Sequence, residues 1–183
     1  MRIRTWILST VTALSATAAC LGGAGAAQAT AAGWSGNGTY RITNVYGHGC
    51  LDVRDANSTN GFPVDQWDCY DVPNQKWTFV PTGDNVYYYI EVTHSRKCLT
   101  VDVSHRSGDF GGDVNQSNCA GANTQMWRIV DAGNGNYALL DRFSGKALDL
   151  DTRTGGGLGA PVHNWTYYNG NNNNQLWNLT KVG

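Results

Sequence analysis

The chain has 183 residues, 13 basic and 14 acidic side chains, and a composition rich in Gly, Asn, Tyr and Trp. Only 15% of the residues are charged, which argues against an amphipathic helical bundle, and the abundance of turn- and strand-forming residues favours short strands. No basic stripe is present that could neutralise a phosphate backbone, so the composition argues against a nucleic-acid partner.

The first 29 residues have the pattern of a secretory signal peptide. Arg2 and Arg4 give a positively charged start, and residues 6–19 follow as an uncharged, mostly apolar or small run. Ala27-Gln28-Ala29 has the small-residue pattern of a cleavage site, and Ala29-Thr30-Ala31 is a close rival. The apolar run is too short and too rich in Ser, Thr and Gly for a transmembrane helix. We therefore expect a secreted, extracellular protein without a membrane span.

Cleavage after Ala29 would leave a short tail over residues 30–37 and a length over residues 38–183 that suits one domain. The removed segment contains two basic and no acidic residues, so the mature chain keeps 11 basic and 14 acidic residues and a net charge near −3. Cys20 offers an alternative, the lipid anchor of a lipoprotein. However, Thr17 stands where lipoprotein signals usually carry Leu, which weakens this interpretation.

A repeat of about 50 residues organises the rest of the chain. The tripeptide Gln-x-Trp occurs three times at intervals of 50 residues, as Gln75-Lys76-Trp77, Gln125-Met126-Trp127 and Gln175-Leu176-Trp177. Three copies at equal spacing do not arise by chance in so short a chain. We place the repeats at residues 38–85, 86–134 and 135–183.

Each repeat contains four short apolar or alternating runs that predict strands, with Gly, Asn and Asp turns between them. The runs lie at 40–42, 50–53, 64–67 and 75–77 in repeat one, at 88–90, 98–101, 114–117 and 125–127 in repeat two, and at 137–139, 147–150, 162–165 and 175–177 in repeat three. About twelve strands result, and the repeats must share a core because one unit cannot bury its apolar face alone. Alternation would place Gln and Trp of each tripeptide on one strand face, with the three Trp side chains in the core.

Four cysteines remain outside the signal, an even number that suits an exported chain. Cys50 and Cys69 lie 19 residues apart in repeat one, and Cys98 and Cys119 lie 21 apart in repeat two. Repeat three has lost both partners together, with Ala147 and Tyr167 at the matching positions. Three connectivities are formally possible, and the joint loss favours Cys50–Cys69 and Cys98–Cys119. Each bond should contribute roughly 3 kcal/mol in the chain-entropy model.

Three segments of repeat one together resemble the ricin-B-type lectin family: Cys-Leu-Asp-Val at 50–53, Trp67-Asp68-Cys69 and Asn74-Gln75-Lys76-Trp77. The resemblance recurs more loosely in repeats two and three and extends from about Thr39 to Leu179. It implies an all-β fold, the β-trefoil, in which a six-strand barrel is capped by three hairpins.

The same resemblance implies sugar pockets in repeats one and three. A pyranose ring offers a C–H face to an aromatic platform and hydroxyls to a carboxylate and an amide. In repeat one the implied ligands are Asp52, Asp65, Trp67 and Asn74, with Gln75 bracing the pocket, although Asp and Asn also commonly serve turns. In repeat three the matching residues are Asp149, His163, Trp165, Asn174 and Gln175.

The repeats differ in ways that matter for binding. In repeat three His163 replaces an acid, and the loop between Trp165 and Asn174 is two residues longer than its counterpart. Repeat two has Thr100, Ser117 and Thr124 at the carboxylate, platform and amide positions, so we interpret this repeat as structural.

Enzymatic readings find little support in the sequence. The four histidines have no metal-ligand spacing, no G-x-S-x-G elbow is present, and Asp52 with Asp65 is the one carboxylate pair worth weighing for glycoside hydrolysis. A hydrolase needs one acid with a raised pKa, and an exposed pocket offers no obvious means of desolvating that acid.

We therefore expect a monomeric lectin without cofactor, metal site or catalytic residues. Its partner would be a glycan, either galactose-type sugars or a xylan-like polysaccharide. The alternative is a trefoil protease inhibitor or other protein-binding scaffold, which inhibition assays would separate from a lectin. The Asp, Trp and Asn sets of repeats one and three favour the sugar-binding hypothesis.

Overall fold

The computed structural model describes residues 34–104 and 110–182. The expected signal peptide and Cys20 lie outside the described residues. Four helical turns occur in the described part, all of the 3₁₀ type: η1 (Arg54–Ala56), η2 (Pro73–Gln75), η3 (Asn123–Gln125) and η4 (Asn173–Gln175). None of the helices in these two segments has the length and apolar character needed to cross a membrane.

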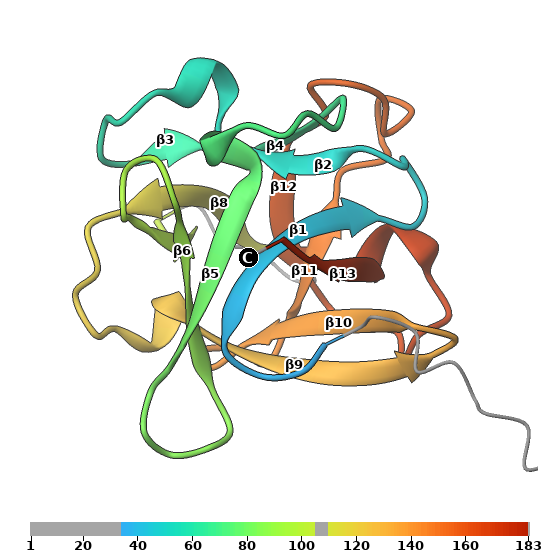
Figure 1. The fold of residues 1–183 in the computed structure, drawn as a ribbon. Coiled ribbons are helices and arrows are strands. Elements are labelled where there is room, and N and C mark those ends of the chain that lie inside the picture. Colours follow the sequence, from blue (N-terminus) through green and yellow to red (C-terminus); the bar gives the residue numbers. More distant parts are fainter. Residues whose placement is uncertain (1–33, 105–109, 183) are drawn as a thin grey trace, which may run out of the picture.

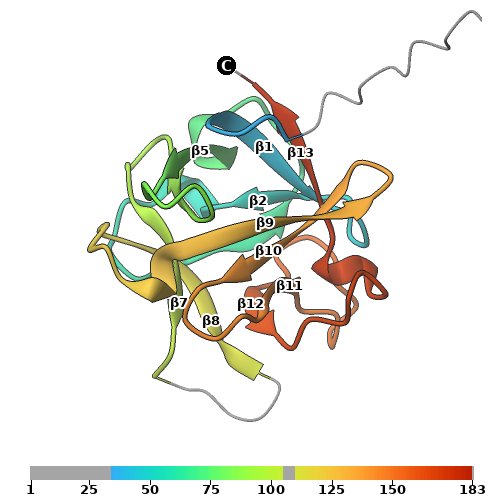
Figure 2. The ribbon, with the colours of Figure 1, turned by 90° about the horizontal axis from the view of Figure 1, so that it is seen from below.

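Six strands close into a barrel (Figures 1 and 2). They are β1 (Gly38–Asn44), β5 (Lys76–Pro81), β6 (Tyr88–Val92), β9 (Met126–Gly133), β10 (Asn136–Asp141) and β13 (Trp177–Lys181). Strand β1 pairs with β5, β5 with β6, β6 with β9, β9 with β10, β10 with β13, and β13 again with β1, all antiparallel. Closure leaves the barrel without a free edge, which removes a site of unwanted strand pairing.

Three hairpins cap the barrel, one from each repeat. They pair β2 (Cys50–Asp52) with β4 (Asp65–Trp67), β7 (Cys98–Asp102) with β8 (Phe110–Ser117), and β11 (Ala147–Leu150) with β12 (Val162–Trp165). This arrangement is a β-trefoil and confirms the predicted fold. Residues 34–104 and 110–182 contain 13 named strands instead of about twelve, because β3 (Phe62–Pro63) forms an additional two-residue pairing with β8 of the next repeat.

The three motif tryptophans form the centre of the core. Trp77, Trp127 and Trp177 are fully buried in one apolar cluster. Each indole N–H donates to the carbonyl of a leucine in the hairpin strand of its own repeat, at 2.9, 2.9 and 3.0 Å, respectively, from Leu51, Leu99 and Leu148. A buried indole needs such a partner. The predicted structural role of these side chains is confirmed.

The alternation predicted that Gln and Trp of each motif share one strand face, and this prediction is wrong. Gln75, Gln125 and Gln175 each end a 3₁₀ turn, and the barrel strand begins after them. All three are nonetheless buried. The turn re-aims each glutamine side chain toward its own hairpin, where it meets polar partners.

Both predicted disulfides are present. Cys50 bonds to Cys69 and Cys98 to Cys119, with Cα atoms 5.1 and 5.2 Å apart. In repeat three the matching Ala147 lies in a small apolar cluster against which Tyr167 packs. Both positions that a disulfide joins in the other repeats thus contribute to one apolar cluster in repeat three.

The segment before the barrel contributes to the core as well. Trp34 lies within the segment that we expected to be a tail. Its ring packs edge-on against those of Phe79 and Tyr88, with centroid distances of 4.7 and 4.9 Å, and its centroid is 5.3 Å from that of the Tyr40 ring. Its backbone N–H donates to the Tyr137 hydroxyl at 3.2 Å. The folded part of the chain therefore extends at least to Trp34.

Candidate functional site

The pocket of repeat one is organised around a carboxylate at the end of β2. Asp52 Oδ2 accepts hydrogen bonds from Asn74 Nδ2 at 3.1 Å and from Gln75 Nε2 at 2.7 Å. Gln75 also donates to the Asp68 carbonyl and accepts from the Tyr70 N–H, so its amide is fixed on both sides. Burial raises the pKa of Asp52, and the hydrogen bond from Gln75 opposes that shift. The bracing role predicted for Gln75 has its physical basis in these contacts.

A hollow of about 330 Å³ opens beside this carboxylate; its walls are Asp52, Arg54, Asp55, Trp67, Tyr70, Val72, Asn74 and Gln75. The Trp67 ring is 36% exposed and is available as a platform. The Arg54 guanidinium lies over this ring, 5.4 Å from its centroid, in a cation–π contact. The hollow thus combines an indole face with oxygen acceptors and amide donors.

Asp65 does not line this hollow. It is 7% exposed and forms an ion pair with Arg54, and both residues line a separate, smaller hollow of about 150 Å³. Burial raises the pKa of Asp65 to about 6, and the charge of Arg54 works against that shift. Asp65 therefore holds Arg54 beside the Trp67 ring. Arg54 belongs to the pocket wall, and Asp65 lies behind it.

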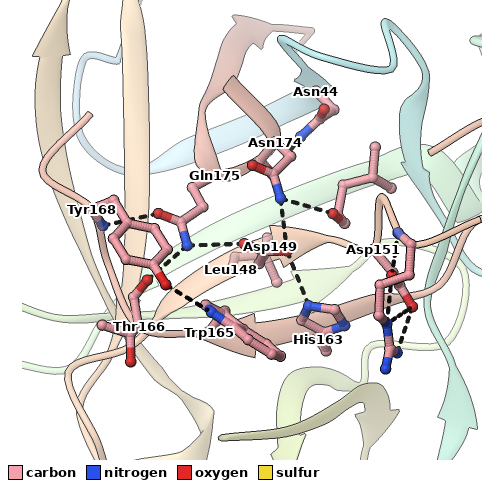
Figure 3. A network of polar contacts seen from close by, with 12 residues as sticks. Asn44, Leu148, Asp149, Asp151, His163, Trp165, Thr166, Tyr168, Asn174 and Gln175 are labelled. Atoms are coloured by element: carbon pink, nitrogen blue, oxygen red, sulfur yellow. Dashed lines mark hydrogen bonds and ion pairs between the residues drawn. The ribbon is translucent and has the colours of Figure 1, made fainter. Parts of the chain in front are cut away.

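The pocket of repeat three repeats this arrangement (Figure 3). Asp149 Oδ1 accepts from Asn174 Nδ2 at 3.0 Å and Asp149 Oδ2 from Gln175 Nε2 at 2.9 Å. Gln175 donates also to the Thr166 carbonyl and accepts from the Tyr168 N–H, the same pattern as Gln75. Gln175 is fully buried, and its side chain holds Asp149, the Thr166 carbonyl and the Tyr168 N–H together.

A hollow of about 250 Å³ lies over Asp149; its walls are Asp149, Asp151, Thr152, Arg153, His163, Trp165, Tyr168, Asn172 and Asn174. His163 Nε2 is 3.0 Å from Asp149 Oδ1, and both side chains are almost fully buried. At one side of the pocket Arg153 binds both oxygens of Asp151, and these hydrogen bonds lower the pKa of Asp151. Unlike Asp65, its counterpart His163 does line its pocket.

Repeat two keeps the buried motif glutamine but lacks the carboxylate and the indole of the other two pockets. Gln125 Nε2 donates to Thr100 Oγ1 at 3.0 Å and to the Asn118 carbonyl at 2.9 Å, and its Oε1 accepts from the Ala120 N–H at 2.7 Å. A hydroxyl thus occupies the place of the carboxylate, and Ser117 stands in place of the platform. These contacts fit the predicted structural role of this repeat.

The sequence analysis missed a second aromatic side chain in each pocket. Tyr70 and Tyr168 line the two hollows, and the backbone N–H of each is held by the motif glutamine. Ala120 has the same backbone contact in repeat two. A usable signal was present, because an aromatic residue follows the platform by three positions in repeats one and three and is replaced by alanine in repeat two.

One group of potential metal ligands comes together within residues 34–104 and 110–182, Glu91 with Cys98 and Cys119. The two sulfurs are joined in a disulfide, which leaves no thiolate for a metal.

A curated relative and solved structures resemble this chain. The ribosome-inactivating protein PMRIPt of Polygonatum multiflorum is 30% identical over 94 residues, which cover 51% of this chain and 14% of that protein. The designed threefold-symmetric protein ThreeFoil is 34% identical with a TM-score of 0.71 over 79% of this chain and 99% of its own.

An exo-β-1,3-galactanase from Clostridium thermocellum is 27% identical with a TM-score of 0.72 over 79% of this chain and 30% of its own. The chain therefore corresponds to less than a third of the galactanase and to about a seventh of the plant protein. The model of the ricin-type beta-trefoil lectin domain-like family matches residues 26–109 and 87–165, most of the sequence. With the barrel, the hairpins and the repeated polar pockets in agreement, this chain belongs to the ricin-type β-trefoil lectin domain-like family.

Proposed function

We propose that this chain is a secreted carbohydrate-binding protein that holds sugars in two shallow pockets, one in repeat one and one in repeat three. The observation that carries the proposal is a recurrence. In both repeats a carboxylate held by an Asn and a Gln faces a hollow with an indole on its wall, and in repeat two the carboxylate and the indole are absent.

The chemistry of the walls suits a pyranose. An indole face attracts the C–H side of a sugar ring, and a carboxylate accepts hydrogen bonds from two neighbouring hydroxyls. Asn74 and Asn174 each hold a carboxylate oxygen and so fix the acceptor before a ligand arrives. Such preorganisation reduces the cost of binding.

Two classes of sugar fit this proposal, galactose-type sugars and xylan-like polysaccharides. The similarity to part of an exo-β-1,3-galactanase at 27% identity supports a galactose-containing polymer. One shallow site would bind a sugar with a Kd on the order of 1 mM, which corresponds to a binding free energy of about 4 kcal/mol. Two sites on one rigid domain would bind a polymer with an affinity roughly 10²–10⁴-fold higher than that of one site, because binding is multivalent.

We propose binding without catalysis. Two-carboxylate hydrolysis needs a pair of acids flanking the bond, one with a raised pKa. In repeat one Asp65 is turned to Arg54 and away from the pocket, and in repeat three Arg153 lowers the pKa of Asp151, the opposite of what a general acid requires. The two disulfides support the proposed extracellular location. We place the signal at residues 1–29 and the lectin domain at residues 38–183, with Trp34 of the preceding segment packed against that domain.

Glycan-array binding, followed by calorimetry with galactose and xylose, tests this function. Trp67→Ala and Trp165→Ala should each weaken polymer binding, and the double variant should abolish it because both platforms are gone. Thr100→Ala is the matched control in repeat two and should leave binding within about twofold of wild type. Undiminished binding by the folded double variant would remove both pockets from the account.

A further inference from the structure

Repeat three carries an insertion directly beside its pocket. Six residues separate Tyr168 from Gln175, whereas four separate Tyr70 from Gln75. Both ends are held alike, because each Tyr N–H donates to the side chain of its motif glutamine. The additional residues must therefore bulge outward.

The bulge is a tight, defined turn. Asn169 and Gly170 adopt left-handed backbone conformations, with φ of 51° and 80°, and the Asn171 N–H donates to the Tyr168 carbonyl at 3.1 Å. Asn tolerates the left-handed region better than most residues, and Gly enters it without strain. This Asn-rich stretch therefore has a sequence suited to its shape.

A second hollow, of about 580 Å³, lies on this turn; its walls are Tyr167, Tyr168, Asn169, Asn171 and Asn172. Tyr168 and Asn172 also line the pocket of repeat three, so the two hollows share part of their walls. In the view of Figure 3, Tyr168 lies at the opposite end of that pocket from Asp151, with Asp149 and His163 between them. The second hollow thus adjoins the pocket at its Tyr168 end.

The wall of the second hollow has the chemistry of a neutral sugar site. The Tyr168 ring is 40% exposed, and the Trp165 indole N–H donates to its hydroxyl at 3.3 Å, which orients the ring beside the platform. Asn171 and Asn172 are exposed, and across residues 34–104 and 110–182 neither side-chain amide has a hydrogen-bond partner. Each amide offers a donor and an acceptor, and the wall carries no charge.

We infer that repeat three holds two or more consecutive sugar residues of an uncharged oligosaccharide, the first over Asp149 and Trp165 and the next against Tyr168 and the amides of the Asn-rich turn. This inference rests on the proposed sugar-binding function and deepens it. Repeat three is thereby selective for chain length, in contrast to repeat one, where the shorter connection lacks the turn.

Calorimetry on two single-site backgrounds tests the inference. Trp67→Ala leaves repeat three as the sugar site, and Trp165→Ala leaves repeat one as its matched control. The probes are galactose with β-1,3-linked galactotriose, and xylose with xylotriose. In the Trp67→Ala protein the preferred trisaccharide should bind about tenfold or more tightly than its monosaccharide, whereas in Trp165→Ala the ratio should stay below about threefold.

Adding Tyr167→Phe and Asn171→Ala to the Trp67→Ala background removes polar groups that line only the second hollow. Trisaccharide affinity should fall to within about threefold of the monosaccharide, and monosaccharide affinity should not change. A trisaccharide advantage that survives these substitutions, or that is absent in the Trp67→Ala protein, overturns the inference while monosaccharide binding persists. Loss of monosaccharide binding in both backgrounds would instead overturn the proposed function.

Discussion

The motif glutamines allow the scaffold and the binding site to be separated experimentally. Gln125 and Gln175 are buried and each makes three hydrogen bonds, two of which satisfy backbone groups near the end of the hairpin. The third reaches Thr100 in repeat two and Asp149 in repeat three. Only the second of these partners belongs to a proposed pocket.

Replacing either glutamine with methionine keeps the side-chain length and removes all three hydrogen bonds. Each lost bond should cost about 1 kcal/mol, so the free energy of unfolding should fall by about 3 kcal/mol in both variants. Gln175→Met should also weaken sugar binding in repeat three, because Asp149 and the backbone of Tyr168 lose their support. Gln125→Met should not affect binding.

Urea unfolding with the disulfides intact measures the loss of stability. Calorimetry with galactose and xylose in the Trp67→Ala background measures the binding by repeat three alone, at a temperature where near-UV circular dichroism shows that both variants are folded. Equal loss of binding in Gln125→Met and Gln175→Met would show that the glutamine acts through the whole scaffold. Full binding by Gln175→Met would show that the carboxylate needs no brace.

Other predictions follow from buried groups. Burial raises the pKa of Asp65 to about 6, so ionisation of this side chain opposes folding, and the free energy of unfolding should fall on the order of 2 kcal/mol from pH 4.5 to 7.5. Urea unfolding of Asp65→Asn should lack this decline, and an equal decline with pH in wild type and variant would contradict the prediction. Replacing Cys50 and Cys69 together with Ala should cost about 3 kcal/mol in the same assay, and a loss below about 1 kcal/mol would refute the cross-link's role. Trp127→Phe leaves the Leu99 carbonyl without its donor, so thermal unfolding should report a loss of about 2 kcal/mol or more with sugar binding intact; an unchanged melting temperature would contradict this.

Features with a period of one repeat were predictable from the sequence. The Gln-x-Trp spacing indicated three equivalent units, and a unit that cannot bury its own apolar face must share a core. The joint loss of two cysteines in repeat three indicated the disulfide pairing. These inferences succeeded because each depended on agreement between copies.

Features that break the repeat were harder to predict. Asp65 and His163 occupy matching positions, yet Asp65 turns to Arg54 while His163 lines its pocket, a difference decided by a contact in space. The motif glutamines leave the strand because a 3₁₀ turn precedes it. Trp34 lies outside the repeat and packs on the barrel, which no periodicity indicates.

Tryptophan indole N–H resonances offer the most direct test of the central claim. That claim is that two indoles on the pocket walls, here called the rim indoles, bind sugar, while three indoles in the core support the fold. In a ¹H–¹⁵N spectrum titrated with galactose or xylose, the resonances of Trp67 and Trp165, assigned with Trp67→Phe and Trp165→Phe, should move on saturation. Those of Trp77, Trp127 and Trp177 should stay in place, because these side chains are fully buried and bonded to leucine carbonyls. Saturable binding of either sugar that leaves both rim resonances unmoved would contradict the account.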